Sequence, residues 1–336
     1  MSALFRLFIF LSVVLTTLAG ADQGYAQDVK FFSIGTGGTS GTYYPIGSII
    51  ANAISNPPGS LECDKGGSCG VPGLIARVQS SSGSIVNVKD IASGAVQLAL
   101  SQADIAYWAY NGSGLFHHDE PNQALRSIAN LYPESLHVVV LRYSGIKKIT
   151  DLVGKRVSLG EEGSGTLVES MAILKAYGLT KDDVTPEYLR PGAASLAMSE
   201  GTLDAFFFVA GYPVTAITDL TRSLDIKILP ISGKPAENVL TFYPFFTKSV
   251  IPAGTYEGVG EVETISIGAQ LLVSADIEDD IVYQITTALW HENTRKMLDS
   301  GHAKGREIQL KTALDGLAVP LHPGAERYYR ENGLLE

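Results

Sequence analysis

The chain has 336 residues, of which 25 are Lys or Arg and 35 are Asp or Glu, so its net charge is −10. An acidic chain without a basic stripe lacks the positive surface that binds nucleic acids, and anionic membranes do not attract it. Hydrophobic residues make up 45% and charged residues 18% of the chain, which is typical of a folded protein. The length favours two compact lobes over one core.

An export signal is predicted for residues 1–26. Arg6 precedes an apolar run over residues 7–18, and small residues that suit signal peptidase follow at 19–21 or 24–26. The run is shorter than the roughly 20 residues that span a bilayer, so cleavage is favoured over a membrane anchor. We therefore expect an exported protein of the periplasm, with no membrane span of its own after cleavage.

Cys63 and Cys69 are the only cysteines of the chain. Because disulfides persist in exported proteins, we expect these two residues to close a small disulfide loop. Two free thiols are the alternative. No His stands near them in the sequence, so a zinc site or a redox motif is not supported, and no metal is expected.

Strands and helices alternate along the first part of the chain. A strand, a glycine turn and a helix are predicted in succession at 29–34, 35–41 and 43–54. The same order returns at 156–159, 160–165 and 166–177. Such alternation predicts an α/β fold with parallel sheets.

The similarity between the two parts extends over a second unit. In the first part, a strand, a turn, a helix and a strand are predicted at 77–79, 80–84, 85–93 and 94–102. In the second part, the matching elements are predicted at 188–190, 191–192, 193–199 and 201–209. We interpret these as two related βαβαβ halves, the first enlarged by the segment 57–72 that carries the cysteines.

Two further strands are expected to cross between the lobes, at 136–141 and 264–273. A long amphipathic helix over 277–298 and the tail through 321–325 should then pack on the first lobe. This organisation gives one lobe of residues 27–137 plus 266–336, and a second lobe of residues 138–265. A cleft between two such lobes is where ligands of α/β proteins bind.

Each predicted glycine turn places hydroxyls and bare backbone at the start of a helix, where N–H groups lack partners and the helix dipole favours anions. Ordinary capped turns are the alternative, but two equivalent turns in a two-lobed chain favour ligand binding. Replacing Ser164 and Thr166 with Ala is expected to weaken binding without unfolding. The candidate ligand-binding residues are Thr36, Gly37, Gly38, Thr39, Tyr44, Ser81, Ser82, Gly83, Ser84, Asn87, Gln102, Gly163, Ser164, Gly165, Thr166 and Tyr212. Arg77 and Arg190 could add a salt bridge or lie on a solvated rim.

Catalytic motifs fail on inspection. Residues 66–70 match the spacing of a nucleophile elbow but lack the strand and helix that this motif needs. Residues 35–40 miss the third glycine of the dinucleotide fingerprint, and no P-loop occurs. The run 117–120 is interpreted as a polar surface loop and Glu161-Glu162 as solvated, so we expect no enzyme, no catalytic residue and no cofactor.

Five segments, taken in order, resemble the TAXI family of solute-binding proteins from tripartite ATP-independent periplasmic (TRAP) transporters. They are GTGGTSGTYYP at 35–45, GSGT at 163–166, DAFFFVAGYP at 204–213, IPAGTY at 251–256 and LHPGA at 321–325. The resemblance implies a type II periplasmic binding protein fold. It also implies an organic-acid ligand such as 2-oxoglutarate, glutamate or a four-carbon dicarboxylate, and a sodium-coupled membrane partner. The chain departs from the family pattern in the insertion at 63–69 and in the segment 81–87.

The sequence thus predicts a monomeric receptor that captures a small organic acid by closing its two lobes and delivers it to a TRAP transporter. One alternative is a periplasmic sensor module that passes ligand occupancy to a receptor kinase. A second alternative is a periplasmic hydrolase, for which the sequence offers no nucleophile held by a base.

Overall fold

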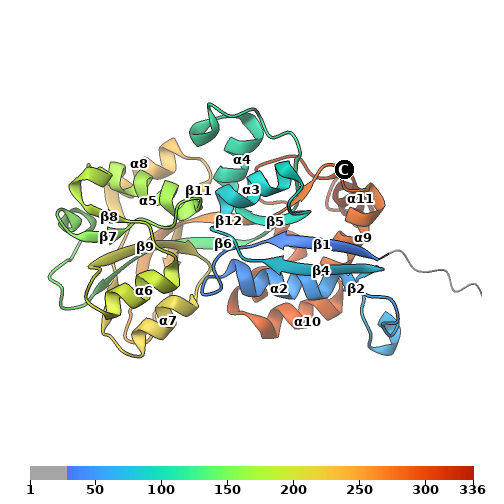
Figure 1. Cartoon of the computed structure of the whole chain (residues 1–336), viewed down its shortest axis with the longest axis horizontal. Coiled ribbons are helices and arrows are strands. Elements are labelled where there is room, and N and C mark those ends of the chain that lie inside the picture. Colours follow the sequence, from blue (N-terminus) through green and yellow to red (C-terminus); the bar gives the residue numbers. More distant parts are fainter. Residues whose placement is uncertain (1–28) are drawn as a thin grey trace, which may run out of the picture.

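The elements form two groups that lie side by side along the long axis of the molecule, joined by long strands (Figure 1). The computed structural model describes residues 29–336, so the predicted signal at 1–26 lies outside the described residues. Within the described part of the chain, no helix combines the length and the apolar character needed to cross a bilayer.

The first group is built on three parallel strands in the order β4-β1-β5. In chain order its elements are β1 (Lys30–Gly35), α2 (Tyr43–Ile54), β4 (Leu74–Gln79), α3 (Ser84–Ser93) and β5 (Leu98–Gln102). Helix α2 buries Ile46, Ile50 and Ile54, which are spaced four residues apart and so form one stripe along the helix. The predicted strand–turn–helix order is therefore confirmed in this half.

The second group repeats this arrangement with three parallel strands in the order β8-β7-β9. Its elements are β7 (Arg156–Ser158), α5 (Gly165–Ala176), β8 (Thr185–Glu187), α6 (Pro191–Ser199) and β9 (Ala205–Ala210). The predicted strand at 188–190 is wrong, because β8 ends at Glu187. The predicted turn at 191–192 is also wrong, because Pro191 is the first residue of α6, a position where its missing N–H costs nothing.

Strands β6 (Leu125–Leu141) and β12 (Val262–Ser274) run through both groups. β12 pairs with β5 of the first group, β6 pairs with β9 of the second, and the two long strands pair with each other antiparallel. The predicted crossing strand at 136–141 covers only the end of β6. Pro133, Glu134 and Ser135 interrupt the apolar pattern, and this interruption hides the first part of the strand.

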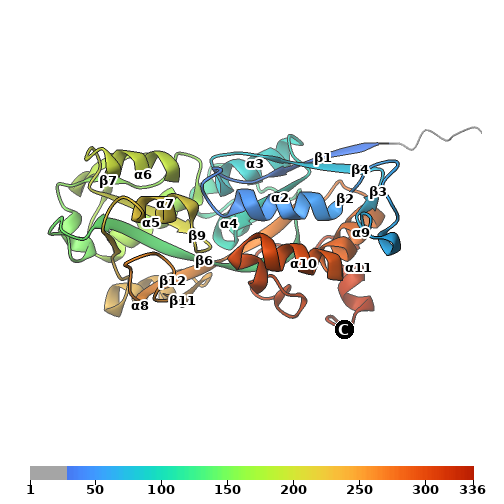
Figure 2. The same ribbon diagram turned by 90° about the horizontal axis from the view of Figure 1, so that it is seen from below.

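The strands of both groups form one continuous ten-stranded sheet, and the remaining helices lie around it. They are α4 (Ala103–Asn111), α7 (Thr215–Thr221), α8 (Gly233–Phe242), α9 (Asp279–Leu289), α10 (Glu292–Gly301) and α11 (Pro323–Glu331). The predicted single helix at 277–298 is wrong, because α9 ends at Leu289 and His291 caps α10 by accepting the N–H of Asn293. Figure 2 shows α9, α10 and α11 packed beneath the first group, where the tail was expected.

The remaining strands are short or lie at the edges of the sheet. β10 (Ile226–Ile228) pairs with β6, and β11 (Phe246–Ile251) pairs with β12. β2 (Ser55–Asn56) and β3 (Val71–Pro72) form a separate pair that flanks the inserted segment.

Cys63 and Cys69 form a disulfide bond within that insertion. His291, distant in sequence, places its Nε2 3.7 Å from Sγ of Cys63. As expected, no His lies near the cysteines in the sequence, but the fold places His291 beside Cys63. Both sulfurs are committed to the disulfide, so neither is a thiolate that could bind a metal.

Candidate ligand cleft

A small cavity of about 50 Å³ lies between the two groups of elements. The first group and β6 contribute Gly37, Gly38, Gly41, Thr42, Tyr43, Ser82, Gly83, Ser84, Gln102 and Glu134. The second group contributes Gly160, Glu161, Ser164, Gly165, Thr166, Leu189, Pro191, Phe208, Val209 and Ala210. Both predicted glycine turns therefore reach the same cavity.

The structure brings part of the predicted site together around this cavity. The predicted residues that line it are Gly37, Gly38, Ser82, Gly83, Ser84, Gln102, Ser164, Gly165 and Thr166. The predicted residues outside the lining are Thr36, Thr39, Tyr44, Ser81, Asn87, Gly163 and Tyr212. The lining residues that sequence reasoning left out include Glu134, Glu161, Phe208 and Pro191.

Thr36 and Asn87 act in the scaffold behind the first turn. Both side chains are fully buried. The hydroxyl of Thr36 donates to the carbonyl of Gln79, and the amide of Asn87 donates to the carbonyls of Thr36 and Leu100, each at 2.7 Å. The Asn87 side chain therefore ties the ends of β1 and β5 together. A side chain at Gly35 would collide with it, since a Cβ there would lie 2.8 Å from Oδ1 of Asn87.

Tyr43, rather than the predicted Tyr44, faces the cavity. Its hydroxyl donates to Oε2 of Glu134 at 2.8 Å and lies 3.5 Å from Oγ of Ser84. Burial, followed by the nearby charge of Glu134, raises the pKa of Tyr43 well above its usual value, so this phenol stays protonated.

Glu134 supplies a carboxyl group to the wall of the cavity from the middle of β6. Its side chain is 1% exposed. Burial raises the pKa of Glu134 to about 8, although the hydrogen bond from Tyr43 opposes that shift. The sequence signal for this residue is weak, because Glu134 is one of several polar side chains in β6. Glu134 stands out only once it is known that β6 is buried on both faces, and the local sequence pattern does not reveal that burial.

Two more carboxyl groups lie buried beside the cavity, Asp104 on α4 and Glu169 on α5. The amide of Gln102 lies 3.5 Å from Oε2 of Glu169. Among the described residues, Oδ2 of Asp104 and Oε1 of Glu169 have no hydrogen-bond partner. Burial raises the pKa of Asp104 to about 7 and raises that of Glu169 well above its usual value, where the charge of Asp104 also contributes.

The second glycine turn is held by its own hydroxyls. Oγ of Ser164 caps α5 by accepting the N–H of Leu167 at 3.2 Å, and it donates to the carbonyl of Glu161 at 2.6 Å. Oγ1 of Thr166 accepts the N–H of Val209 at 3.2 Å. These hydrogen bonds within the protein hold the shape of the turn.

Hydrogen bonds to backbone carbonyls connect the two groups around the cavity. The N–H of Val86, at the start of α3, donates to the carbonyl of Gly163 at 3.2 Å, and the N–H of Ala216 donates to the carbonyl of Ser40 at 3.2 Å. The hydroxyl of Thr42 donates to the carbonyl of Gly211. Glycine allows this approach, since a Cβ at Gly165 would lie 1.7 Å from Oε1 of Gln102. These contacts join the two groups of elements on either side of the cavity.

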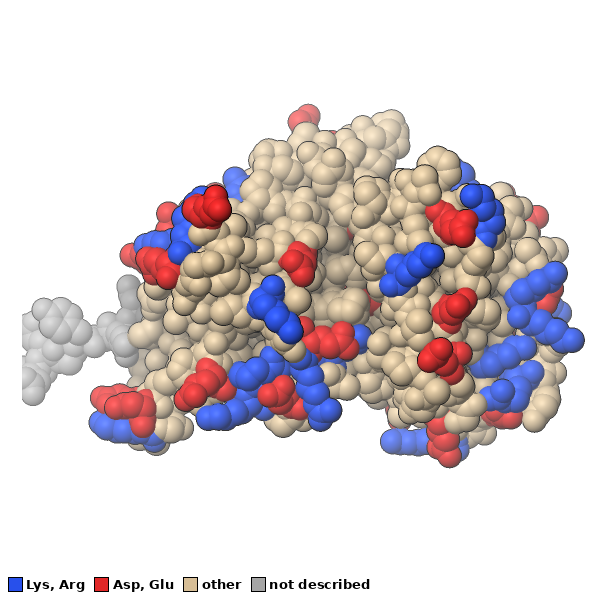
Figure 3. Space-filling model, turned by 180° about the vertical axis from the view of Figure 1, so that it is seen from behind, with Lys and Arg blue, Asp and Glu red and all other residues tan. Residues whose placement is uncertain are grey.

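The two arginines considered from sequence lie outside the cavity lining. Arg190 pairs with Glu161 at 2.6 Å on the rim, and Arg77 donates to Oγ of Ser33 at 3.2 Å. Within the described chain, no Lys or Arg belongs to the lining. On the face shown in Figure 3, acidic and basic side chains are interspersed and form no continuous basic patch.

Two α/β halves of the same strand order, joined by two long antiparallel strands, match the type II periplasmic binding protein fold that was expected from the sequence. A family model described as the NMT1-like family matches residues 34–333, and the chain belongs to that family.

The chain is similar to several solved structures at low sequence identity. A protein of Bordetella bronchiseptica RB50 is 17% identical with a TM-score of 0.52, covering 90% of this chain and 82% of its own. The periplasmic aliphatic sulphonate binding protein SsuA from Escherichia coli is 16% identical with a TM-score of 0.44, covering 90% and 83%. A putative L-cystine ABC transporter protein from Listeria monocytogenes is 13% identical with a TM-score of 0.45, covering 86% and 97%.

Proposed function

We propose that this protein is a periplasmic solute-binding receptor that captures a small organic acid and delivers it to a sodium-coupled TRAP membrane transporter. The observation that carries the proposal is the cavity between two halves of equal strand order, each contributing a glycine turn at the start of a helix. A helix start offers N–H donors and a positive dipole end, which suit the carboxylate of an organic acid.

The two long strands support capture by closure. Residues 27–137 plus 266–336 would move as one lobe and residues 138–265 as the other, with β6 and β12 bending between them. A ligand favours the closed form through contacts with both lobes that only that form allows. The hydrogen bond of Val86 to Gly163 and the close approach of Gly165 to Gln102 are contacts between the lobes that opening would break.

The membrane partner is proposed from the resemblance to the TAXI family. Of the similar solved structures, one is named as a sulphonate binding protein and another as an ABC transporter. An ABC transporter is therefore the alternative membrane partner to a TRAP transporter. Uptake of the ligand by vesicles that hold the cognate membrane subunits decides between them: a sodium gradient drives a TRAP transporter, and ATP drives an ABC transporter.

The side chains that line the cavity are suited to binding a ligand rather than to catalysing a reaction. No His lines it in the described chain, and the hydroxyls of Ser84 and Ser164 are bonded to an amide oxygen and a carbonyl oxygen rather than to a base. A serine without a base is a weak nucleophile. We therefore propose that the protein acts as a monomeric receptor and not as a hydrolase.

Calorimetry tests the binding step. The protein is first unfolded and refolded to remove resident ligand, and is then titrated with dicarboxylates, 2-oxoglutarate and acidic amino acids. Saturable binding at one site per chain is expected, with a negative heat-capacity change because closure buries apolar surface. If none of these acids binds to the refolded protein, the proposal is wrong. A sensor module would also bind the organic acid, but its protein partner would be a receptor kinase instead of transporter subunits.

A further inference from the structure

The charge of the cavity wall restricts the ligand further than the proposed function does. Glu134 and Glu161 belong to the lining, whereas no Lys or Arg of the described chain does. Glu161 is already paired with Arg190 at 2.6 Å. Glu134 has no cationic partner in the wall. A ligand that is only an anion would therefore place its second negative charge against a carboxyl group in a desolvated site.

The surroundings of Glu134 offer hydrogen bonds rather than a positive charge. Tyr43 donates to its Oε2 at 2.8 Å, and Gln102 turns its amide toward the neighbouring Glu169 at 3.5 Å. Unpartnered oxygens of Asp104 and Glu169 lie buried in the same region. Among the described residues, no Lys or Arg donates to these oxygens, whereas an ammonium offers three N–H donors.

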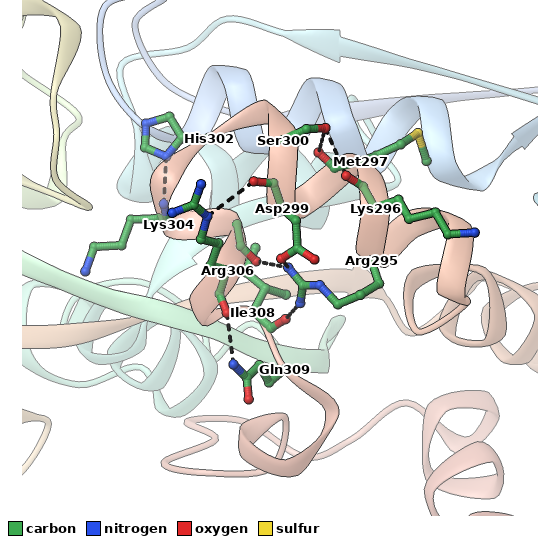
Figure 4. Close-up of polar contacts among 11 residues, drawn as sticks. Arg295, Lys296, Met297, Asp299, Ser300, His302, Lys304, Arg306, Ile308 and Gln309 are labelled. Atoms are coloured by element: carbon green, nitrogen blue, oxygen red, sulfur yellow. Dashed lines mark hydrogen bonds and ion pairs between the residues drawn. The ribbon is translucent and has the colours of Figure 1, made fainter.

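Lys304 is the only lysine whose charge acts on Glu134 among the described residues. It is committed elsewhere, because its Nζ bonds both carboxylate oxygens of Glu307 at 2.8 and 3.0 Å and lies 3.7 Å from the ring centre of Tyr212. Figure 4 shows its side chain extending away from the Arg295–Asp299 pair. Lys304 is therefore not a lining residue, and its charge, which acts on Glu134 from outside the cavity, is hydrogen-bonded to Glu307.

We infer that Glu134 selects a ligand that carries a protonated nitrogen beside its carboxylate, so that the solute is an amino acid and not a keto acid or simple dicarboxylate. This inference rests on the proposed function and narrows it. The carboxylate of the ligand would meet the helix starts at the glycine turns, while its ammonium pairs with Glu134. Charge-assisted hydrogen bonds of this kind are the strong ones in a dry site.

Proton release provides a second readout. Tyr43 from α2, Tyr132 from β6, Asp104 from α4, Glu169 from α5, Gln102 from β5 and Lys304 all face Glu134. Burial raises the pKa of Glu134 to about 8, so at pH 7 most of the ligand-free protein holds a proton there. An ammonium would displace that proton, whereas a dianion would keep it bound. Binding of an amino acid should therefore release close to one proton at pH 7.

The experiment compares L-glutamate with 2-oxoglutarate. The two differ at one carbon, where glutamate carries an ammonium group and 2-oxoglutarate a keto oxygen. In calorimetry with refolded protein, glutamate or another amino acid should bind at least about 100-fold more tightly than its keto analogue. Titrations in buffers of different ionisation enthalpy should show proton release. Glu134→Gln should reduce that preference by at least about tenfold and abolish the release, and Tyr43→Phe, which keeps the ring, should reduce the preference less.

Glu187→Gln, the same change at an exposed position on β8, is the control. If 2-oxoglutarate or a dicarboxylate binds as tightly as the amino acid, or if E134Q keeps the wild-type preference while its thermal melt is unchanged, the inference is wrong and the proposed function stands. If neither class binds, both are wrong. Should E134Q fail to fold, the wild-type comparison and the proton count still decide the matter.

Discussion

The two halves share one strand order but build different walls for the cavity. The wall of the first half is a network of polar side chains, in which Ser84 bonds Gln102 and Tyr43 bonds Glu134. The wall of the second half is a glycine turn that caps itself, together with apolar side chains such as Phe208. Equal topology therefore fixes where the cavity lies, and unequal side chains decide what can enter it.

Under the proposed function, this difference assigns separate tasks to the two walls. The second wall is set by its own capping bonds and by the close approach of Gly165, so its main task is to complete the closed form. The first wall holds the groups that can recognise charge. Changes in the second wall should alter closure or stability for every ligand, whereas changes in the first wall should alter the choice between ligands.

The largest effect is expected from Gly165→Ala. A Cβ there would lie 1.7 Å from Oε1 and 2.7 Å from Cδ of Gln102, whose Oε1 is held by the hydroxyl of Ser84 at 2.6 Å. The closed form must then open or lose that bond. Affinity should fall about 100-fold, or ~2.7 kcal/mol, for every ligand tested by calorimetry. Gly260→Ala is the control, because nothing lies within 4 Å of a Cβ there.

Unchanged affinity in the Gly165→Ala variant would show that the two halves do not need to approach as closely as they do here. A loss confined to one ligand would assign Gly165 to recognition instead of closure, and the separation of tasks between the walls would be wrong.

The second prediction concerns pH and the buried carboxyl groups of the first wall. Burial raises the pKa of Asp104 to about 7 and of Glu134 to about 8, so the folded protein binds protons that the unfolded chain has lost. Stability of the ligand-free protein should therefore fall as pH rises from 6.5 to 8, by up to about 1.4 kcal/mol per pH unit for each group. Urea unfolding at several pH values measures this slope.

Asp104→Asn should make that slope shallower, because it removes one of the titrating groups. His137 does not interfere, since burial lowers its pKa to about 4 and its contribution belongs to pH values below 6.5, where stability falls as pH falls. A slope that is flat or positive in the wild type, or equal in D104N, would contradict the protonation of these carboxyl groups.

Sequence predicted the elements whose signals are local. Helix α2 begins and ends at the predicted residues, Tyr43 and Ile54, because a glycine turn precedes it and Pro57 and Pro58 follow shortly after its end. The prediction of one long helix at 277–298 was wrong, because the break between α9 and α10 depends on a single capping residue, His291. The amphipathic pattern of the sequence does not reveal that cap.

The candidate site was predictable only in part, for a similar reason. The glycine turns are visible in the sequence because glycine at the start of a helix is a local feature. Glu134 and Asp104 matter because distant segments bury them, and burial is a property of the whole fold. The choice between Tyr43 and Tyr44 likewise depends on which face of α2 meets β6, and residue type alone does not settle it.

The third prediction tests the first wall through Ser84→Ala. Oγ of Ser84 donates to Oε1 of Gln102 at 2.6 Å and accepts the N–H of Gln102 at 3.1 Å, and the side chain is 1% exposed. Removing the hydroxyl leaves two buried groups without a partner, so the free energy of unfolding should fall by about 1–3 kcal/mol. Urea unfolding measures it, and a loss below the Ser164→Ala value would contradict the tighter network assigned to the first wall.

The smallest effect is expected from Ser164→Ala in the second wall. The sequence predicted weaker binding without unfolding, but the hydroxyl of Ser164 is spent on the N–H of Leu167 and the carbonyl of Glu161. Loss of a helix cap of this kind should lower the free energy of unfolding by about 1 kcal/mol, against a change within about 0.5 kcal/mol for the exposed Ser300→Ala. Because the hydroxyl is already bonded, affinity measured by calorimetry should change less than in G165A. A larger loss of affinity than of stability would instead return Ser164 to the ligand-binding role that the sequence suggested, and would make the two walls more alike than their hydrogen bonds indicate.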